Sequence, residues 1–223
     1  RLRCMSVSEI VERAGSTASR AMARRRLPEP VAVPPPQLDR AGVAWLPATA
    51  PAQRGVALQR ADEVLSGQWR IYSRLLGLGF PPEWNRNPDK AALLPLTDGK
   101  VMSFRATAVV GDIKYLRELN RHRELVVLAQ AWRLTGRERY LDGIATLLES
   151  WFAQCPHPRG PNWSSALEAG IRLINWAIVW QLIGGMQSPL FERPVGKVLR
   201  TDWLSSIWQH AEFIRGFRSR ESA

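Results

Sequence analysis

A polar stripe on an apolar segment is the first place where the sequence could carry chemistry. Glu168, Arg172 and Asn175 are spaced by four and three residues in the segment that follows Ser165, and a helix brings such positions onto one face. Charges inside an apolar helix need a partner, because an unpaired buried charge is costly. One interpretation is a Glu168–Arg172 pair within the helix, with Ser165 and Glu168 forming an N-terminal capping box.

The alternative interpretation is that this stripe faces a cleft. The Arg172 guanidinium would then bind a substrate carboxylate, for which its planar fork of donors is well suited. Asn162 and Trp163 come directly before the helix, and they would form the floor of the same cleft. The residues alone leave both interpretations open.

A second polar group stands at the beginning of the first long helical segment. Asp112 precedes this segment as a candidate N-cap, and Lys114, Glu118, Arg121 and His122 fall on or near one helical face. The second half of the segment is apolar nearly all round, which is typical of a helix buried among others. The polar first turns therefore either form a solvated face or emerge at the rim of a cleft.

Other kinds of chemistry have no motif in the sequence. His122, His157 and His210 share no metal-ligand spacing with one another or with Cys4 and Cys155. Nucleophile, phosphate-loop and dinucleotide motifs are missing as well, and two distant cysteines do not indicate a disulfide framework. We therefore expect no cofactor and no metal ion, and we nominate no catalytic residue.

The elements that position these groups follow from periodicity and turn residues. Turns marked by Pro and Gly separate the apolar segments, and apolar spacings of three and four indicate amphipathic helices. We expect a basic helix at 6–26, a Pro-rich linker at 28–36, a helix running into a strand or turn at 55–80, irregular structure at 85–110, and long helices at 113–134, from Tyr140 to Cys155, at 165–185 and at 197–217.

Long helices joined by short connections pack as antiparallel hairpins. The sequence thus predicts an all-α fold, and a bundle, an α-solenoid and an α/α toroid would all show this pattern. We divide the chain into a basic helix with its linker at 1–40, an irregular region with a short helix at 41–112, and helical hairpins at 113–223.

The composition favours a polyanionic partner. Lys and Arg number 31 against 20 Asp and Glu, so the formal net charge is +11 at pH 7. A surface of this charge attracts nucleic acid, anionic lipid or acidic polysaccharide. The ten tryptophans belong to a residue type that serves both in cores and in stacking on sugars. No segment reaches the roughly 20 apolar residues of a membrane span, so we expect no membrane partner.

Several of these motifs occur together in one known family. The sequence resembles the N-terminal domain of the heparinase II/III family of polysaccharide lyases, which is also present in related alginate lyases. The resemblance covers about residues 80–217, and the ordered occurrence of its motifs is more specific than any one of them. The matching motifs are Gly111-Asp112-Ile113-Lys114, Glu118-Leu119-Asn120-Arg121-His122, Leu134-Thr135-Gly136, Asn162-Trp163, Ala166-Leu167-Glu168 and Ile171-Arg172.

The resemblance implies an incomplete (α/α) toroid followed by a β-sandwich domain. An acidic, uronate-containing polysaccharide, such as heparan sulfate, alginate or an exopolysaccharide, would lie in the cleft between them. The family's chemistry is β-elimination, in which Asn or Arg neutralises the uronate carboxylate and His or Tyr transfers protons. The family's catalytic Asn, Tyr and His are expected beyond Ala223, so we expect a fragment without lyase activity. The family also implies a periplasmic location, although no signal peptide is visible.

The same resemblance assigns a substrate-binding surface without a catalytic role. Seven residues would line the toroid side of the cleft, and nucleic acid is not the expected partner of such a surface. The competing hypothesis is a non-enzymatic basic helical module that binds nucleic acid or an anionic glycan. The seven residues are Asn162, Trp163, Arg172, Asp112, Glu118, Arg121 and His122.

Overall fold

The structure is a computed structural model, and it describes residues 53–97, 99, 110–192 and 194–216. These residues belong to one compact unit, Val33–Ala223. They are mostly helical, which confirms the main part of the predicted fold class. The predicted basic helix at 6–26 and the Pro-rich linker at 28–36 lie outside the described residues.

The helices begin and end close to the predicted turns. Ser165 caps α7 by accepting from the Glu168 amide at 3.5 Å, as predicted. The α-helices of the described part are α2 (Arg54–Leu65), α4 (Ile113–Leu119), α5 (Arg123–Thr135), α6 (Glu138–Gln154), α7 (Ala166–Leu182) and α8 (Pro194–Gly216), and the 3-10 turns are η4 (Pro161–Trp163), η5 (Gly185–Gln187) and η6 (Pro189–Phe191).

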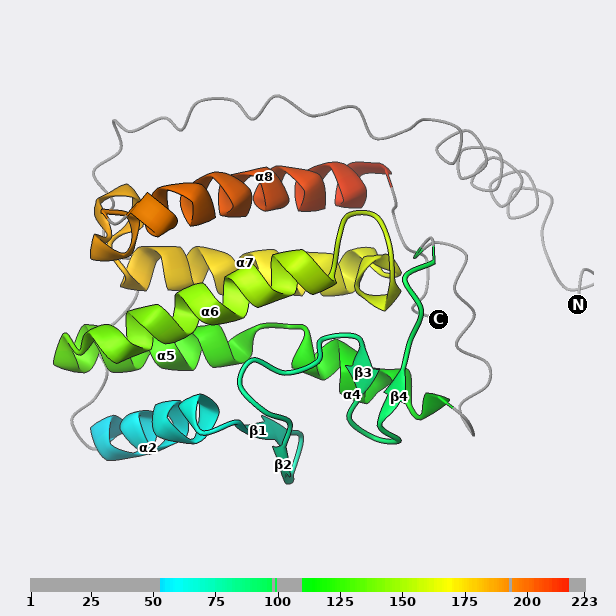
Figure 1. The fold of residues 1–223 in the computed structure, drawn as a ribbon, viewed down its shortest axis with the longest axis horizontal. Helices are drawn as coiled ribbons and strands as arrows, with labels where there is room; N and C mark the ends of the chain where they lie inside the picture. Colours follow the sequence, from blue (N-terminus) through cyan, green and yellow to red (C-terminus); the bar gives the residue numbers. More distant parts are fainter. Residues whose placement is uncertain (1–52, 98, 100–109, 193, 217–223) are drawn as a thin grey trace, which may run out of the picture. The chain divides into compact units, whose positions relative to one another are not determined.

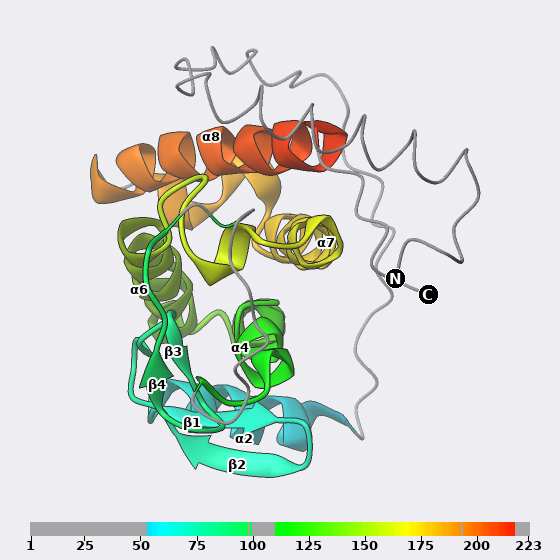
Figure 2. The ribbon, with the colours of Figure 1, turned by 90° about the vertical axis from the view of Figure 1, so that its right-hand side faces the viewer.

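The long helices form two layers (Figures 1 and 2). Helices α5 and α7 pack side by side in one layer, and α6 and α8 pack together in the other. The consecutive pairs α5–α6 and α7–α8 are hairpins that each span both layers, as their short connections require. Helix α2 packs against α5 and extends the first layer.

The predicted helix at 113–134 is interrupted, which corrects the sequence-based expectation. Asn120, Arg121 and His122 separate α4 from α5, and His122 has a left-handed φ of +61°. The Asn120 side chain donates to the backbone oxygen of Leu116 at 2.9 Å and so closes the end of α4. A side-chain amide and one left-handed residue end the helix without changing the apolar spacing, and for this reason the periodicity did not reveal the break.

Two short antiparallel strand pairs qualify the all-α prediction. Strand β1 (Gln68–Ile71) pairs with β2 (Arg74–Gly77), and β3 (Arg86–Asn87) pairs with β4 (Ala92–Leu93). The β1–β2 hairpin packs against α2, where a strand or turn was expected. The β3–β4 pair corrects the expectation of irregular structure at 85–110, because strands of two residues are too short to show an alternating pattern.

Tryptophan supplies much of the core. Edge-to-face ring contacts such as that of Trp151 with Trp176, at 5.8 Å between centroids, contribute beyond the area they bury. Tyr140 of α6 is fully buried as well. The tryptophans with less than 2% of their surface exposed are Trp69, Trp84, Trp151, Trp163, Trp176 and Trp203.

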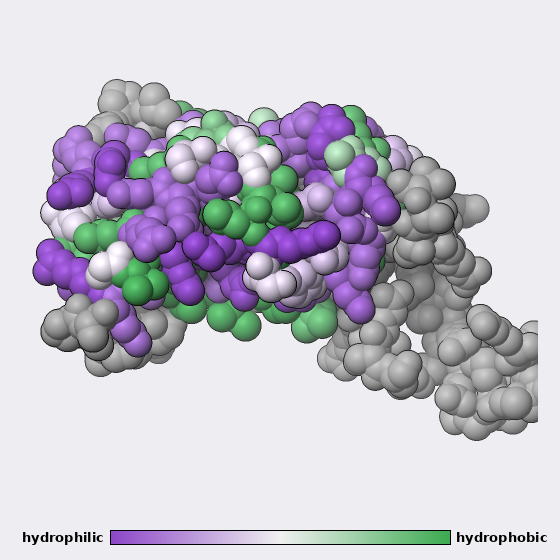
Figure 3. Space-filling model, turned by 90° about the horizontal axis from the view of Figure 1, so that it is seen from below, coloured by the Kyte–Doolittle hydropathy of each residue, from purple (hydrophilic) through white to green (hydrophobic). Residues whose placement is uncertain are grey.

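The face that carries α2 and the β1–β2 hairpin is mostly hydrophilic, with small hydrophobic patches between the polar residues (Figure 3). The exposed apolar side chains of these elements include Val56 of α2 and Leu75 of β2. Across the described ranges, no helix combines the length and the apolar character needed to cross a membrane.

Candidate functional site

The Arg172 guanidinium lies inside the protein and bonds to the backbone of one other predicted cleft residue, Asn162. Arg172 is 1% exposed. Its Nη1 and Nη2 donate to the backbone oxygens of Asn120 at 2.8 Å and Asn162 at 2.9 Å. Its Nε donates to His210 Nε2 at 2.9 Å, and the guanidinium lies 4.7 Å from the centroid of the Trp151 ring. Arg172 therefore joins the α4–α5 break, the η4 turn and α8.

Burial sets the protonation of this group. Burial lowers the pKa of Arg172 to about 10, and it lowers the pKa of His210 well below the ordinary value. His210 Nε2 accepts from Arg172, and His210 Nδ1 lies 2.6 Å from the Ser206 carbonyl oxygen. The imidazole is therefore neutral, with its proton on Nδ1. We call Arg172, Asn120, Asn162, His210 and Trp151 the Arg172 network.

His122 lies beside the Arg172 network and is 1% exposed. Its ring centroid lies 5.1 to 5.7 Å from those of Trp84, Trp151 and Trp176. Trp176 Nε1 donates to His122 Nδ1 at 2.8 Å. Burial, together with the nearby charge of Arg172, lowers the pKa of His122 well below its ordinary value. In this structure His122 is a neutral core residue.

Glu168 binds Arg121, which corrects the interpretation of a Glu168–Arg172 pair. Arg121 Nε and Nη2 donate to the two Glu168 carboxylate oxygens at 2.8 and 2.9 Å, and Nη1 donates to Glu118 at 2.7 Å. The hydrogen bonds with Glu168 raise the pKa of Arg121. Arg123 pairs with the other Glu118 oxygen. The interruption between α4 and α5 brings Arg121 to α7, so the bridge forms between helices.

An open pocket of about 430 Å³ lies between α2, β1, α5 and α7. Three arginines from three elements line it: Arg60 of α2, Arg70 of β1 and Arg123 of α5. Its volume falls in the range of roughly 300–1,000 Å³ that is usual for small-molecule sites. We call it the arginine pocket, and its lining residues are Arg60, Glu63, Val64, Gln68, Arg70, Tyr72, Arg123, Glu124, Val126, Val127 and Asn175.

The rim arginines keep much of their side chains in solvent. Arg70 and Arg123 are 49% and 54% exposed. Arg70 donates twice to Glu63 at 2.8 Å, and these bonds lower the pKa of Glu63. Exposed ion pairs contribute little to stability. An anion that enters the pocket can therefore compete for these guanidinium groups at small cost.

Tyr72 stands at the rim with a strained backbone. It is the first residue of the two-residue turn between β1 and β2, and its φ is +55°. Glycine usually takes that position, and a left-handed residue of another type costs on the order of 1–3 kcal/mol and is typical of binding sites. The side chain is 52% exposed, and it packs edge-on against Tyr115 at 5.3 Å. An exposed ring at a pocket rim is suited to stacking on a sugar.

Glu124 is the buried carboxyl of the arginine pocket. It is 7% exposed, and burial raises its pKa to about 7. Its Oε2 has no hydrogen-bond partner among the described residues. The pocket thus combines a cationic rim, an exposed aromatic ring and a buried carboxyl. Arginine side chains are suited to pairing with an anionic group through charge-assisted hydrogen bonds.

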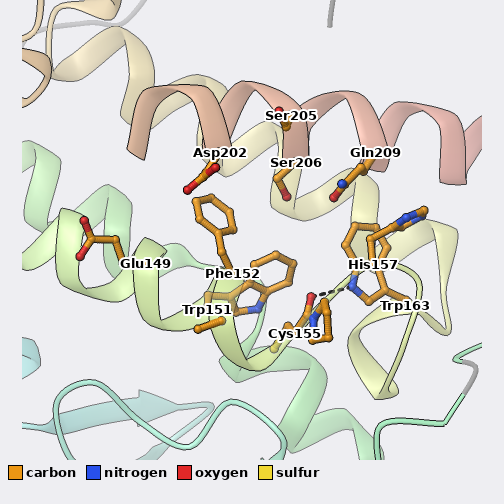
Figure 4. Close-up of a pocket in the computed structure, with 12 residues that line it drawn as sticks. Glu149, Trp151, Phe152, Cys155, His157, Trp163, Asp202, Ser205, Ser206 and Gln209 are labelled. Carbon is orange, nitrogen blue, oxygen red and sulfur yellow. Dashed lines mark hydrogen bonds between the residues drawn. The ribbon is translucent and has the colours of Figure 1, made fainter. Parts of the chain in front are cut away.

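A larger pocket, of about 580 Å³, opens between α6 and α8 (Figure 4). Asp202 projects from α8 toward Phe152 of α6, and His157 and Trp163 lie at the other end. The lining includes the carboxylates of Glu149 and Asp202, and no lysine or arginine stands among its lining residues in the described part of the chain. This charge is opposite to the one that an acidic ligand requires, so the arginine pocket is the better candidate.

Among the residues that the structure describes, no group of three or more His, Cys, Asp or Glu side chains could hold a metal ion. Cys155 is buried, and burial raises its pKa to about 12. The thiolate is the nucleophilic form of cysteine, so Cys155 is an inert core thiol at neutral pH.

The sequence model of the family described as the heparinase II/III N-terminus matches residues 80–222, which is more than half of the chain. The chain belongs to this family. Arg123, Glu124 and Asn175 of the arginine pocket lie inside the family domain, whereas Arg60 and Arg70 precede the matched residues. The pocket is therefore built jointly by the family domain and the segment before it.

Two solved structures of the heparan sulfate lyase HepC from Pedobacter heparinus have a similar fold. The crystal structure of HepC matches with a TM-score of 0.55 and 15% identity, over 94% of this chain and 28% of that chain. A HepC mutant matches with a TM-score of 0.56 and 16% identity, over 95% of this chain and 28% of that chain. The chain thus spans about a quarter of the HepC chains, and identities this low show the fold alone. A comparison with curated proteins gave no match.

The seven predicted site residues of this family domain do not share one open surface in the described structure. Arg121 is partly exposed, with 27% of its side chain accessible. Asp112 is also partly exposed, and it caps α4 by accepting from the Lys114 amide at 2.9 Å, as predicted. Substrate contact by the seven residues stays a prediction. The other five, which are between 0% and 6% exposed, are Trp163, Arg172, His122, Glu118 and Asn162.

Sequence reasoning missed most of the arginine pocket. One signal was available: Glu124 places a charge at the start of a segment that is otherwise deeply apolar. The turn at Tyr72-Ser73 has neither Gly nor Asn, so it shows no hairpin signature. The missed residues are Arg60, Arg70, Tyr72, Arg123 and Glu124.

Proposed function

We propose that the chain is the substrate-holding helical part of a polysaccharide lyase, which cleaves uronate-containing acidic polysaccharide by β-elimination. The observation that carries this proposal is the family match over residues 80–222. The arginine pocket supports it, because three guanidinium groups surround a space of sugar-like size. Carboxylates and sulfates are groups that arginine binds through paired, charge-assisted hydrogen bonds.

We also propose that the two helical layers are part of an (α/α) toroid. The hairpins α5–α6 and α7–α8 support this, because each contributes one helix to each layer. The arginine pocket lies at the layer of α5 and α7. In the proposed enzyme a β-sandwich domain faces the toroid, and the polysaccharide lies between the two.

The described residues hold the substrate in this proposal and do not transfer protons. A β-elimination needs a neutralised uronate carboxylate, a base for the proton at C5 and an acid for the leaving oxygen. In the proposal, the rim arginines neutralise the uronate carboxylate. Arg121 and Asp112, whose side chains are partly exposed, are proposed as direct contacts, and Arg172, Asn162, Trp163, Glu118 and His122 as residues that position the surface from below.

Calorimetric binding of hexasaccharides from heparan sulfate and from alginate to the 223-residue chain tests the proposal. The double variant Arg60→Ala/Arg70→Ala should weaken binding by about tenfold, because each guanidinium contact contributes on the order of 0.5–1 kcal/mol in a partly exposed site. Turnover is followed by the ultraviolet absorbance of the unsaturated uronate product, and none is expected from this chain.

A matched control is the double variant Arg133→Ala/Arg215→Ala. It removes the same charge at exposed positions outside the pocket, and Arg215 is paired with Glu212 in the way that Arg70 is paired with Glu63. Its affinity should stay within about twofold of the unmodified chain, since screening weakens distant charges. Equal losses in both double variants, or tighter binding of single-stranded DNA than of either glycan, would reject the proposal in favour of a general polyanion-binding module.

A further inference from the structure

Glu124 is a buried carboxyl whose second oxygen lacks a partner. The residue is 7% exposed, and no described residue makes a hydrogen bond to its Oε2. The neighbouring Arg123 pairs with Glu118 instead. An unsatisfied buried polar atom is destabilising, and such atoms in native structures call for an explanation. Glu124 also lines the arginine pocket, so it borders a space that a ligand can enter.

Polar groups from each of its elements line the pocket together with Glu124. Helix α2 contributes Arg60 and Glu63, and Glu63 is held by Arg70 of β1. The β1–β2 turn contributes the Tyr72 phenol, α5 contributes Arg123, and α7 contributes the Asn175 amide. Asn175 Nδ2 already donates to the Arg121 backbone oxygen at 2.7 Å. Besides Glu124, the pocket is therefore lined by three arginines and one carboxylate, that of Glu63, and this excess of positive charge attracts an anion.

We propose that Glu124 is a specificity-determining residue of the arginine pocket and that the pocket binds one acidic sugar unit. The protonated Glu124 carboxyl donates a hydrogen bond to this sugar, and the anionic group of the sugar lies among Arg60, Arg70 and Arg123. This inference rests on the proposed function and adds the ligand unit and its partner. A carboxylic acid offers one O–H donor and one acceptor oxygen. It can therefore donate to an acid oxygen of the sugar and accept from a hydroxyl.

Protonation and binding are then linked. Burial raises the pKa of Glu124 to about 7, and a bound anion raises it further, because like charges disfavour the ionised form. The chain binds the sugar when Glu124 is protonated and loses affinity as the pH rises through 7. Glu63 does not contribute to this change, because its hydrogen bond with Arg70 lowers its pKa.

Calorimetric titration of the full chain with heparan sulfate hexasaccharide, at about pH 5.5 and about pH 8.5, tests the inference. With a pKa near 7, about 3% of Glu124 is protonated at the higher pH, so the apparent affinity should fall by about 30-fold. Glu124→Gln keeps a neutral hydrogen-bonding group and should bind with nearly the same affinity at both pH values. Glu124→Leu should bind about tenfold more weakly than Glu124→Gln, and Glu63→Gln should keep the pH dependence.

The possible failures are distinguishable. If the unmodified chain binds no hexasaccharide at either pH, the proposed function is rejected and this inference with it. If the chain binds equally well at both pH values, or if Glu124→Gln keeps the full pH dependence, only the role of Glu124 is rejected. Circular dichroism checks that each variant is folded. Should Glu124→Leu not fold, the near-isosteric Glu124→Gln still decides the outcome through its pH profile.

Discussion

Replacement of Arg172 by alanine should destabilise the chain strongly. The guanidinium donates to the backbone oxygens of Asn120 and Asn162 and to His210 Nε2. Arg172→Ala removes all three donors and leaves three buried acceptors without partners. It also leaves a cavity at the face of the Trp151 ring that the guanidinium covers.

The size of the effect follows from opposing contributions. Each stranded acceptor costs about 1–3 kcal/mol, which gives about 3–9 kcal/mol for three. The change relieves the burial of a cation: the pKa of Arg172 falls from 12.5 to about 10, and this difference corresponds to roughly 3 kcal/mol. The cavity adds to the loss. We expect a net decrease in the free energy of unfolding of about 3–5 kcal/mol.

Urea unfolding followed by tryptophan fluorescence measures this loss, because Trp151 belongs to the Arg172 network and Trp163 and Trp176 pack against it. Arg133→Ala on α5, an exposed position, is the control and should cost less than about 0.5 kcal/mol. A loss below about 1 kcal/mol in Arg172→Ala would refute the reasoning. The Arg172 side chain would then be free to serve a ligand rather than the core.

Three further predictions concern the pocket and the core thiol. The pKa of Glu124 in the folded chain, about 7, exceeds the ordinary value of 4.5, so the contribution of Glu124 to stability is complete below pH 4.5 and is lost as the pH rises through 7. The free energy of unfolding of Glu124→Gln should therefore exceed that of the unmodified chain by up to about 3 kcal/mol near pH 8 and by little near pH 4. An identical difference at both pH values in urea unfolding would contradict the assigned burial. Tyr72→Gly should weaken hexasaccharide binding about fivefold with little change in melting temperature, since the relieved backbone strain offsets the lost ring contact. The control Ala91→Gly relieves a φ of +52° at another turn and should leave hexasaccharide binding unchanged. In a Cys4→Ala variant, Ellman's reagent should modify Cys155 only in denaturant, and rapid modification of the native chain would show that the thiol is accessible.

The helical architecture could be predicted because apolar periodicity records burial directly. The segments around Tyr140–Trp151 and Ser165–Leu182 formed the expected helices. The interruption at Asn120 could not be predicted, because it depends on a side-chain amide bonding to a distant backbone oxygen, that of Trp84, as well as to its own helix. Such a bond leaves no mark on the pattern of apolar residues.

The sequence missed most of the arginine pocket, and for the Arg172 network it predicted some of the members but not their role. The sequence singled out Arg172, Asn162 and Trp163 as one group, and Arg172 does bond to the Asn162 backbone in the structure. Polar residues on an apolar helix show only that a partner is required. Whether that partner is a substrate carboxylate or the protein's own carbonyl oxygens depends on where other helices end, and the sequence pattern does not contain this information.

The bonds of Arg172 also constrain the order in which the chain folds. Its three acceptors lie 52, 10 and 38 positions away along the sequence, and contacts over long separations form only after the intervening loops have closed. Both hairpins must therefore be nearly assembled before the guanidinium can form all three hydrogen bonds. These bonds form late in folding, so Arg172→Ala should increase the rate of unfolding far more than it decreases the rate of folding.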